Sequence, residues 1–89
     1  MALLSTKLRK PSKSVVTTLA ENIRRLRHER NLSQEELADM CGIHRTYVGS
    51  VERSERNVTL SSLELFADAL GVSVIQLLTP AQDGRKSRK

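Results

Sequence analysis

The sequence predicts an all-α domain of five helices, and three observations support this. Apolar residues recur at spacings of three and four, which is the period of one helical face. Ser, Thr and Gly stand where such segments would begin and end, as Ser33, Ser73, Gly42 and Gly71 do. The segments are also joined by short polar links. Each helix can therefore be placed in turn.

The first helix is expected from about Val15 to Arg30. Its inner face would carry Val16, Leu19, Ile23 and Leu26. Arg27 follows Ile23 by four residues, at the edge of that face, whereas Arg24 and Arg25 would lie further out, in solvent. Asn31 ends the helix, because asparagine tolerates the left-handed conformation.

Residues 33–52 are expected to form two short helices joined by a tight turn. Ser33 and Glu36 have the spacing of a capping box, and Gly42 suits a turn that needs positive φ. The second helix would begin near His44. The inward residues of the pair would be Leu37, Ala38, Met40, Val48 and Val51. This spacing predicts a helix-turn-helix.

A polar loop, residues 53–59, leads to two further helices. Thr59 would cap the fourth, which runs to about Leu70 with Leu60, Leu63, Phe66, Ala67 and Leu70 inward. Ser73 would cap a short fifth helix that Pro80 closes. Three apolar residues are left over on these helices, and we interpret them as a dimer patch: Leu65, Ile75 and Leu78.

The charge of the 89-residue chain is +5, and its location matters more than its total. Eight of the 15 basic residues lie in the two tails, which leaves 7 basic and 9 acidic residues between positions 15 and 82. We therefore divide the chain into a flexible basic arm (1–14), one domain (15–80) and a basic disordered tail (81–89). Such tails suit a polyanionic partner, although solvated basic tails are common.

Enzyme, metal and membrane functions find little support. Cys41, His28 and His44 share no metal-ligand spacing, and Cys41 is expected to be a small buried residue. No apolar run approaches the length of a membrane span. A single cysteine suits a reducing compartment, so we expect a cytoplasmic protein without a cofactor, metal or small-molecule ligand.

The second helix of the motif would enter the major groove of double-stranded DNA. The expected base contacts are Arg45, Thr46 and Ser50. The expected phosphate contacts are Gln34, Tyr47, Arg53, Arg56 and Asn57. Alternatives remain at four of these. Arg45 could be a solvated helix arginine, Arg53 and Arg56 could instead pair with Glu52 or Glu55, and Tyr47 could be a half-buried packing residue.

Arg27 and Glu52 flank apolar faces that should meet. We therefore expect a partly buried ion pair between the first helix and the end of the second motif helix.

These residues resemble a known family. The segment from LSQEELADMCGIHRTYVGSVE to LELFADALGVS is similar to the Cro/C1-type helix-turn-helix regulators, whose fold is the lambda-repressor-like domain. The resemblance implies DNA contacts at Gln34, Arg45, Thr46 and Ser50 and an ion pair between Arg27 and Glu52. HRTY and ERxxRN are especially similar to controller proteins of restriction–modification systems, which are homodimers on palindromic operators. Ser54, where many relatives have glycine, and Gly49, where many have a polar residue, depart from the pattern.

We therefore expect a homodimeric, sequence-specific regulator of double-stranded DNA and no enzyme activity. Alternatives are a phage- or plasmid-type repressor and, from another class, a protein-interaction module such as an antitoxin or adaptor. A redox sensor acting through Cys41 has little support.

Overall fold

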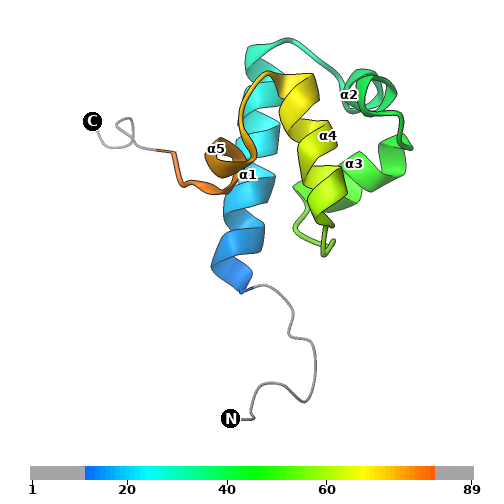
Figure 1. Ribbon diagram of the computed structural model, residues 1–89. Coiled ribbons are helices and arrows are strands. Elements are labelled where there is room, and N and C mark those ends of the chain that lie inside the picture. Colours follow the sequence, from blue (N-terminus) through cyan, green and yellow to red (C-terminus); the bar gives the residue numbers. More distant parts are fainter. Residues whose placement is uncertain (1–11, 82–89) are drawn as a thin grey trace, which may run out of the picture.

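The computed structural model describes residues 12–81, and within this range the chain forms five α-helices (Figure 1). They are α1 (Lys13–Glu29), α2 (Gln34–Cys41), α3 (Arg45–Glu52), α4 (Leu60–Leu70) and α5 (Val74–Leu78). The predicted all-α fold with its helix-turn-helix at α2 and α3 is confirmed. Residues 1–11 of the predicted arm and residues 82–89 of the predicted tail lie outside the described residues.

α1 begins earlier than the sequence analysis placed it. Ser12 is the N-cap, its hydroxyl accepting a hydrogen bond from the Val15 amide at 3.3 Å, so Lys13 and Ser14 belong to the helix and not to the arm. Apolar spacing does not reveal this start, because the first two residues of α1, Lys13 and Ser14, are polar. The capping box of Ser33 and Glu36 is present as predicted.

Four of the helices end in the same way, with one residue in the left-handed conformation. This residue is Gly42 after α2 and Gly71 after α4, but Asn31 after α1 and Ser54 after α3. After α3, the Ser54 amide donates to the Val51 carbonyl at 3.0 Å and the Glu55 amide donates to the Ser50 carbonyl at 2.9 Å, which is a Schellman motif. Ser54, with φ of 63°, therefore stands where glycine would be less strained.

The core lies where α1 meets α3, α4 and α5, and where α2 packs on α3 and α4. α2 and α3 pack against each other, α3, α4 and α5 contact α1, and α4 joins α2 to α5 (Figure 1). The largest fully buried apolar side chains are Ile23, Leu37, Val48, Phe66, Leu70 and Leu77. The orientation of α3 is therefore set by packing on two sides, against α1 and α2.

The Asn22 side chain of α1 binds the end of α5, a helix of only about one and a half turns. This side chain is 2% exposed, and its amide donates to the carbonyl oxygens of Leu77 at 2.8 Å and Thr79 at 2.9 Å. These carbonyls are at the end of α5, where no helical partner is available. The sequence analysis did not identify this role of Asn22.

Two predicted core positions are wrong. Met40 is 55% exposed and Leu60 is 77% exposed. Met40 lies on a short helix whose buried stripe is already formed by Leu37, Ala38 and Cys41. Leu60 is the first residue of α4, where the chain has just left the polar loop.

The three apolar residues assigned to a dimer patch are all exposed in the single chain. The exposed fractions are 40% for Leu65, 75% for Ile75 and 37% for Leu78. Leu65 lies on α4 and the other two on α5, and these helices pack together. No helix among residues 12–81 has the length and apolar character needed to cross a membrane.

Candidate nucleic-acid interface

The outer face of α3 carries a shallow hollow of about 260 Å³. Gln34 of α2 lines it together with Arg45, Thr46, Gly49 and Arg53. Arg45 and Thr46 are exposed and lie in the first turn of α3. Arg45 approaches Glu35 at 3.9 Å, but both side chains are more than 60% exposed, so this contact holds the guanidinium weakly. Arg45 is therefore available to a ligand that approaches α3.

Gly49 allows the neighbouring side chains to cross α3. A Cβ atom at this position would lie 3.1 Å from Arg53 Nη1 and 3.5 Å from Gln34 Oε1. A Cβ there would crowd only the end of the Arg53 side chain, since 3.5 Å is an ordinary contact distance to Gln34. Arg53 also pairs with Glu55, through Nε and Oε1 at 3.2 Å, which is one of the two alternatives considered from the sequence. Because both partners are exposed, this pair does not prevent a phosphate contact.

Glu52 is the buried acceptor that ties α3 to its neighbours. Its carboxylate is 3% exposed and forms the predicted ion pair, with Arg27 Nε 2.7 Å from Oε2 and Arg27 Nη2 3.0 Å from Oε1. Gln34 Nε2 donates to the same Oε1 at 3.0 Å. Arg27 Nη1 also donates to the Leu32 carbonyl at 2.8 Å. One carboxylate thus links α1, α2 and α3, which fixes the position of α3.

Two further side chains depart from the expected arrangement around Glu52. Arg24 is partly buried, and its Nη1 donates to the Glu52 backbone carbonyl, although we expected Arg24 in solvent. Gln34, expected at a phosphate, donates from its amide nitrogen to the Glu52 carboxylate.

Tyr47, Ser50 and Arg56 form a cluster beside the hollow. Tyr47 is half-buried, stacks on Phe66 with ring centroids 6.4 Å apart, and donates from its hydroxyl to Ser62 at 3.4 Å. Arg56 lies over the outer face of the Tyr47 ring, 4.9 Å from the centroid. This geometry favours the packing alternative for Tyr47, whose ring supports Arg56.

Ser50, an expected base contact, does not line the hollow. Ser50 is 9% exposed, and its hydroxyl donates to the Tyr47 carbonyl at 2.8 Å while it accepts from Arg56 Nε at 3.0 Å. Both bonds occupy the hydroxyl within the protein, because Ser50 faces the loop and not the hollow. Ser50 therefore orients Arg56.

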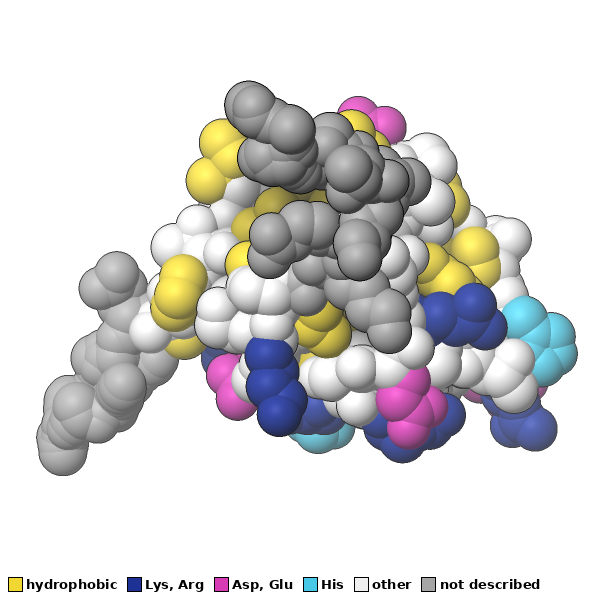
Figure 2. All heavy atoms as spheres, turned by 90° about the horizontal axis from the view of Figure 1, so that it is seen from below, with side chains coloured by type: hydrophobic (Ala, Val, Ile, Leu, Met, Phe, Trp, Pro, Cys, Tyr) yellow, Lys and Arg dark blue, Asp and Glu magenta, His cyan; other side chains and the backbone are white. Residues whose placement is uncertain are grey.

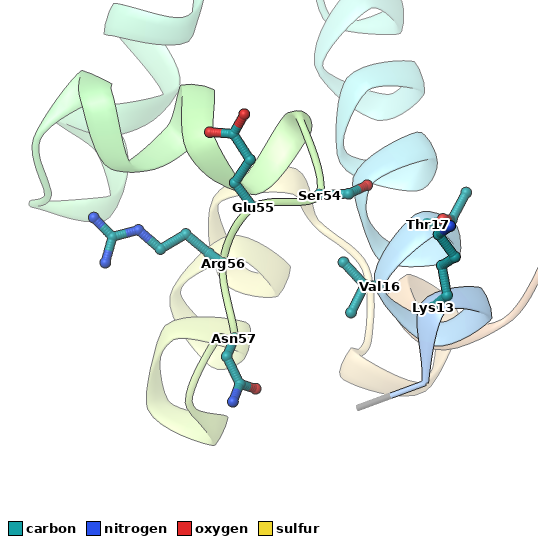
Figure 3. A pocket seen from close by; sticks show the side chains of 7 residues that line it. All are labelled: Lys13, Val16, Thr17, Ser54, Glu55, Arg56 and Asn57. Carbon is teal, nitrogen blue, oxygen red and sulfur yellow. The ribbon is translucent and has the colours of Figure 1, made fainter. Parts of the chain in front are cut away.

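The loop after α3 faces the first turns of α1 across a cavity of about 370 Å³ (Figure 3). Residues 54–57 line one side, and Lys13, Val16 and Thr17 line the other. Figure 3 shows the Arg56 side chain extending away from α1. Asn57, expected at a phosphate, is exposed in the same loop.

Surface charge around this region is mixed. Figure 2 shows Lys and Arg side chains alternating with Asp and Glu along one edge of the face seen from below. Affinity for a polyanion therefore depends on individual arginines and not on a uniformly positive face.

Cys41 is 5% exposed, and its thiol contacts the Leu65 carbonyl at 3.6 Å. Burial raises the pKa of this thiol, which makes it less reactive. Among residues 12–81, no three His, Cys, Asp or Glu side chains are grouped as metal ligands would be.

A family model described as helix-turn-helix matches residues 23–77 of this chain, which include both motif helices. The chain belongs to the Cro/C1-type helix-turn-helix family. This is a family of DNA-binding transcriptional regulators, and the predicted membership is confirmed.

Three members illustrate the similarity. The control protein C.SmaI of Serratia marcescens is 64% identical over 61 residues, which are 68% of this chain and 73% of that protein. The crystal structure of a hypothetical transcription factor from Neisseria covers 86% of this chain and 90% of its own, with 45% identity and a TM-score of 0.73. The restriction–modification controller protein C.Esp1396I was crystallised as a tetramer with its natural 35 base-pair operator. It is 35% identical, covers 71% of this chain and 83% of its own, and has a TM-score of 0.65.

Proposed function

We propose that this regulator is a homodimeric controller protein of a restriction–modification system, which binds a palindromic operator. The observation that carries the proposal is the hollow on α3, where Arg45 and Thr46 are exposed beside Gln34 and Arg53. An arginine there can donate two hydrogen bonds to one guanine in the major groove. The similarity to C.SmaI and to the operator-bound C.Esp1396I supports the controller role.

The proposal also gives roles to the surrounding side chains, which the same geometry supports. Arg45 and Thr46 would contact bases, while Arg53, Arg56 and Asn57 would contact phosphates on either side. Arg56 is held for this contact by Tyr47 and Ser50. Phosphate contacts set the register of the protein on the duplex, and base contacts select the sequence.

The dimer would form through the patch of Leu65, Ile75 and Leu78. Two copies related by a two-fold axis would bury this patch against itself and present two α3 helices to half-sites about one helical turn, roughly 34 Å, apart. Ile75→Asp should give a monomer in analytical ultracentrifugation, because each of two symmetric sites would bury a charge. Met40→Asp, also an exposed apolar residue but on α2, is the matched control. If Ile75→Asp is still a dimer, the interface lies on another surface of the protein.

The experiment that tests the proposed function is a binding titration on DNA from upstream of the protein's own gene, against a random duplex. A specificity ratio above about 10³, with cooperativity that depends on protein concentration, is expected. A ratio near one would refute operator binding. The controller role is tested separately, by measuring whether deleting the gene changes transcription of a neighbouring endonuclease gene.

A further inference from the structure

His44 is the N-cap of α3, and its imidazole lies against Thr46. The backbone amide of Thr46 donates to His44 Nδ1 at 3.1 Å, and the Thr46 hydroxyl oxygen lies 2.8 Å from the same nitrogen. The backbone of His44 is extended, with φ of −79° and ψ of 144°, as an N-cap requires. Histidine is not among the residues preferred at an N-cap, which is why the sequence did not suggest this role.

These two contacts decide the direction of the hydroxyl bond. A backbone N–H can only donate, so Nδ1 must present its lone pair, and the imidazole proton must be on Nε2. A hydroxyl that bonds to an unprotonated nitrogen must also donate. The Thr46 hydroxyl therefore directs its proton at His44, where it shares the single Nδ1 lone pair with the amide, and it offers its oxygen lone pairs to a ligand.

We propose that His44 is a positioning residue that makes Thr46 a hydrogen-bond acceptor, so that Thr46 selects a base with an amino group in the major groove. Those bases are adenine, through N6, and cytosine, through N4. The inference rests on the proposed function, since it takes Thr46 to be a base contact. It deepens that function, because a free threonine hydroxyl can donate or accept and would select no class of base.

The first step of the test locates the base pair that Thr46 contacts. An operator is selected from a randomised duplex pool at pH 8, and every single-base-pair variant is bound to wild type and to Thr46→Val. The position whose base preference is lost in Thr46→Val is the one that Thr46 contacts. We expect adenine or cytosine there, preferred about 2- to 10-fold, as for one neutral hydrogen bond.

The second step removes the amino group alone. Adenine is replaced by purine, or cytosine by 2-pyrimidinone, at that position. The affinity of the wild-type protein for this duplex should fall by the same factor of about 2- to 10-fold, and the affinity of Thr46→Val should not change. An equal loss in both proteins would come from the duplex and would contradict the proposal.

Two variants of His44 test the positioning role. An aspartate side chain at this position would accept from the same amide and hydroxyl, so His44→Asp should keep the base preference. Glycine is a tolerated N-cap without a side chain, so His44→Gly should lose the preference. The preference is a ratio of affinities for operators that differ at one base pair, so a helix that is merely less stable would lower both affinities and leave the ratio unchanged. Circular dichroism checks that each variant is folded.

Three outcomes would overturn the inference. They are a preference for guanine or thymine at the Thr46 position, a His44→Gly variant that retains the wild-type preference, and a Thr46→Val variant that changes no position. All three leave specific operator binding intact, whereas failure to select any operator at pH 8 would refute the proposed function itself.

Discussion

Arg27→Met should destabilise the domain more than the loss of any surface charge. The substitution keeps an unbranched side chain in place but removes the partner of a carboxylate that is 3% exposed. Glu52 would lose the bonds from Arg27 Nε at 2.7 Å and Nη2 at 3.0 Å and keep only that from Gln34. The Leu32 carbonyl would also lose its donor.

The expected loss is about 3–5 kcal/mol in the free energy of unfolding, which is the cost of leaving one member of a buried ion pair without its partner. A domain of this length has a total stability of about 4–10 kcal/mol. The variant should therefore be close to unfolding at 25 °C. The double variant Arg27→Met, Glu52→Met should recover at least about 2 kcal/mol, because no buried charge remains and Gln34 can bond to water.

Urea denaturation at one fixed protein concentration, followed by circular dichroism, measures these differences. Arg53→Met is the matched control, since Arg53 pairs with Glu55 with both side chains more than half exposed, and it should cost less than about 0.5 kcal/mol. A loss below about 1 kcal/mol for Arg27→Met, or a double variant less stable than the single one, would refute the reasoning.

Three further predictions follow from other parts of the molecule. Arg45→Ala should weaken operator binding by about 1–3 kcal/mol and relax the preference at one base pair, whereas equal losses on operator and random duplex would make Arg45 a phosphate contact. Ser54→Gly should stabilise the domain by up to about 1 kcal/mol in urea denaturation, because φ of 63° is strained for serine. Asn31→Gly should raise the free energy of unfolding by less, since asparagine adopts the left-handed conformation more readily than serine. Equal increases for the two variants would mean that Ser54 is not strained. Burial raises the pKa of Cys41 above 9.0, so the unfolded thiol ionises first and stability should fall as the pH rises through 9.0, by at most about 1.4 kcal/mol per pH unit. Cys41→Ala should remove that part of the alkaline loss, and an unchanged pH profile would contradict it.

The positions of the helices follow from interactions between residues that lie close together in the sequence. The inward periodicity of Leu19, Ile23 and Leu26 and the capping box of Ser33 and Glu36 each depend on residues within one helix, so five helices and the helix-turn-helix could be predicted. The pairing of Arg27 with Glu52 could also be inferred, because both residues border faces that must meet. The mistakes occurred where apolar residues outnumbered the positions that a small core can bury, as at Met40 and Leu60.

The directions of individual polar bonds were decided only by the tertiary structure. The sequence by itself determined that Ser50 and Thr46 lie on α3, yet it could not determine that the loop returns to bring Arg56 onto Ser50. Nor could it determine that the cap of α3 brings His44 Nδ1 within 2.8 Å of the Thr46 hydroxyl oxygen. A hydroxyl donates or accepts according to neighbours that tertiary packing supplies. Sequence spacing gave the candidate residues of the interface, and the fold decided which of their polar atoms are already bonded within the protein.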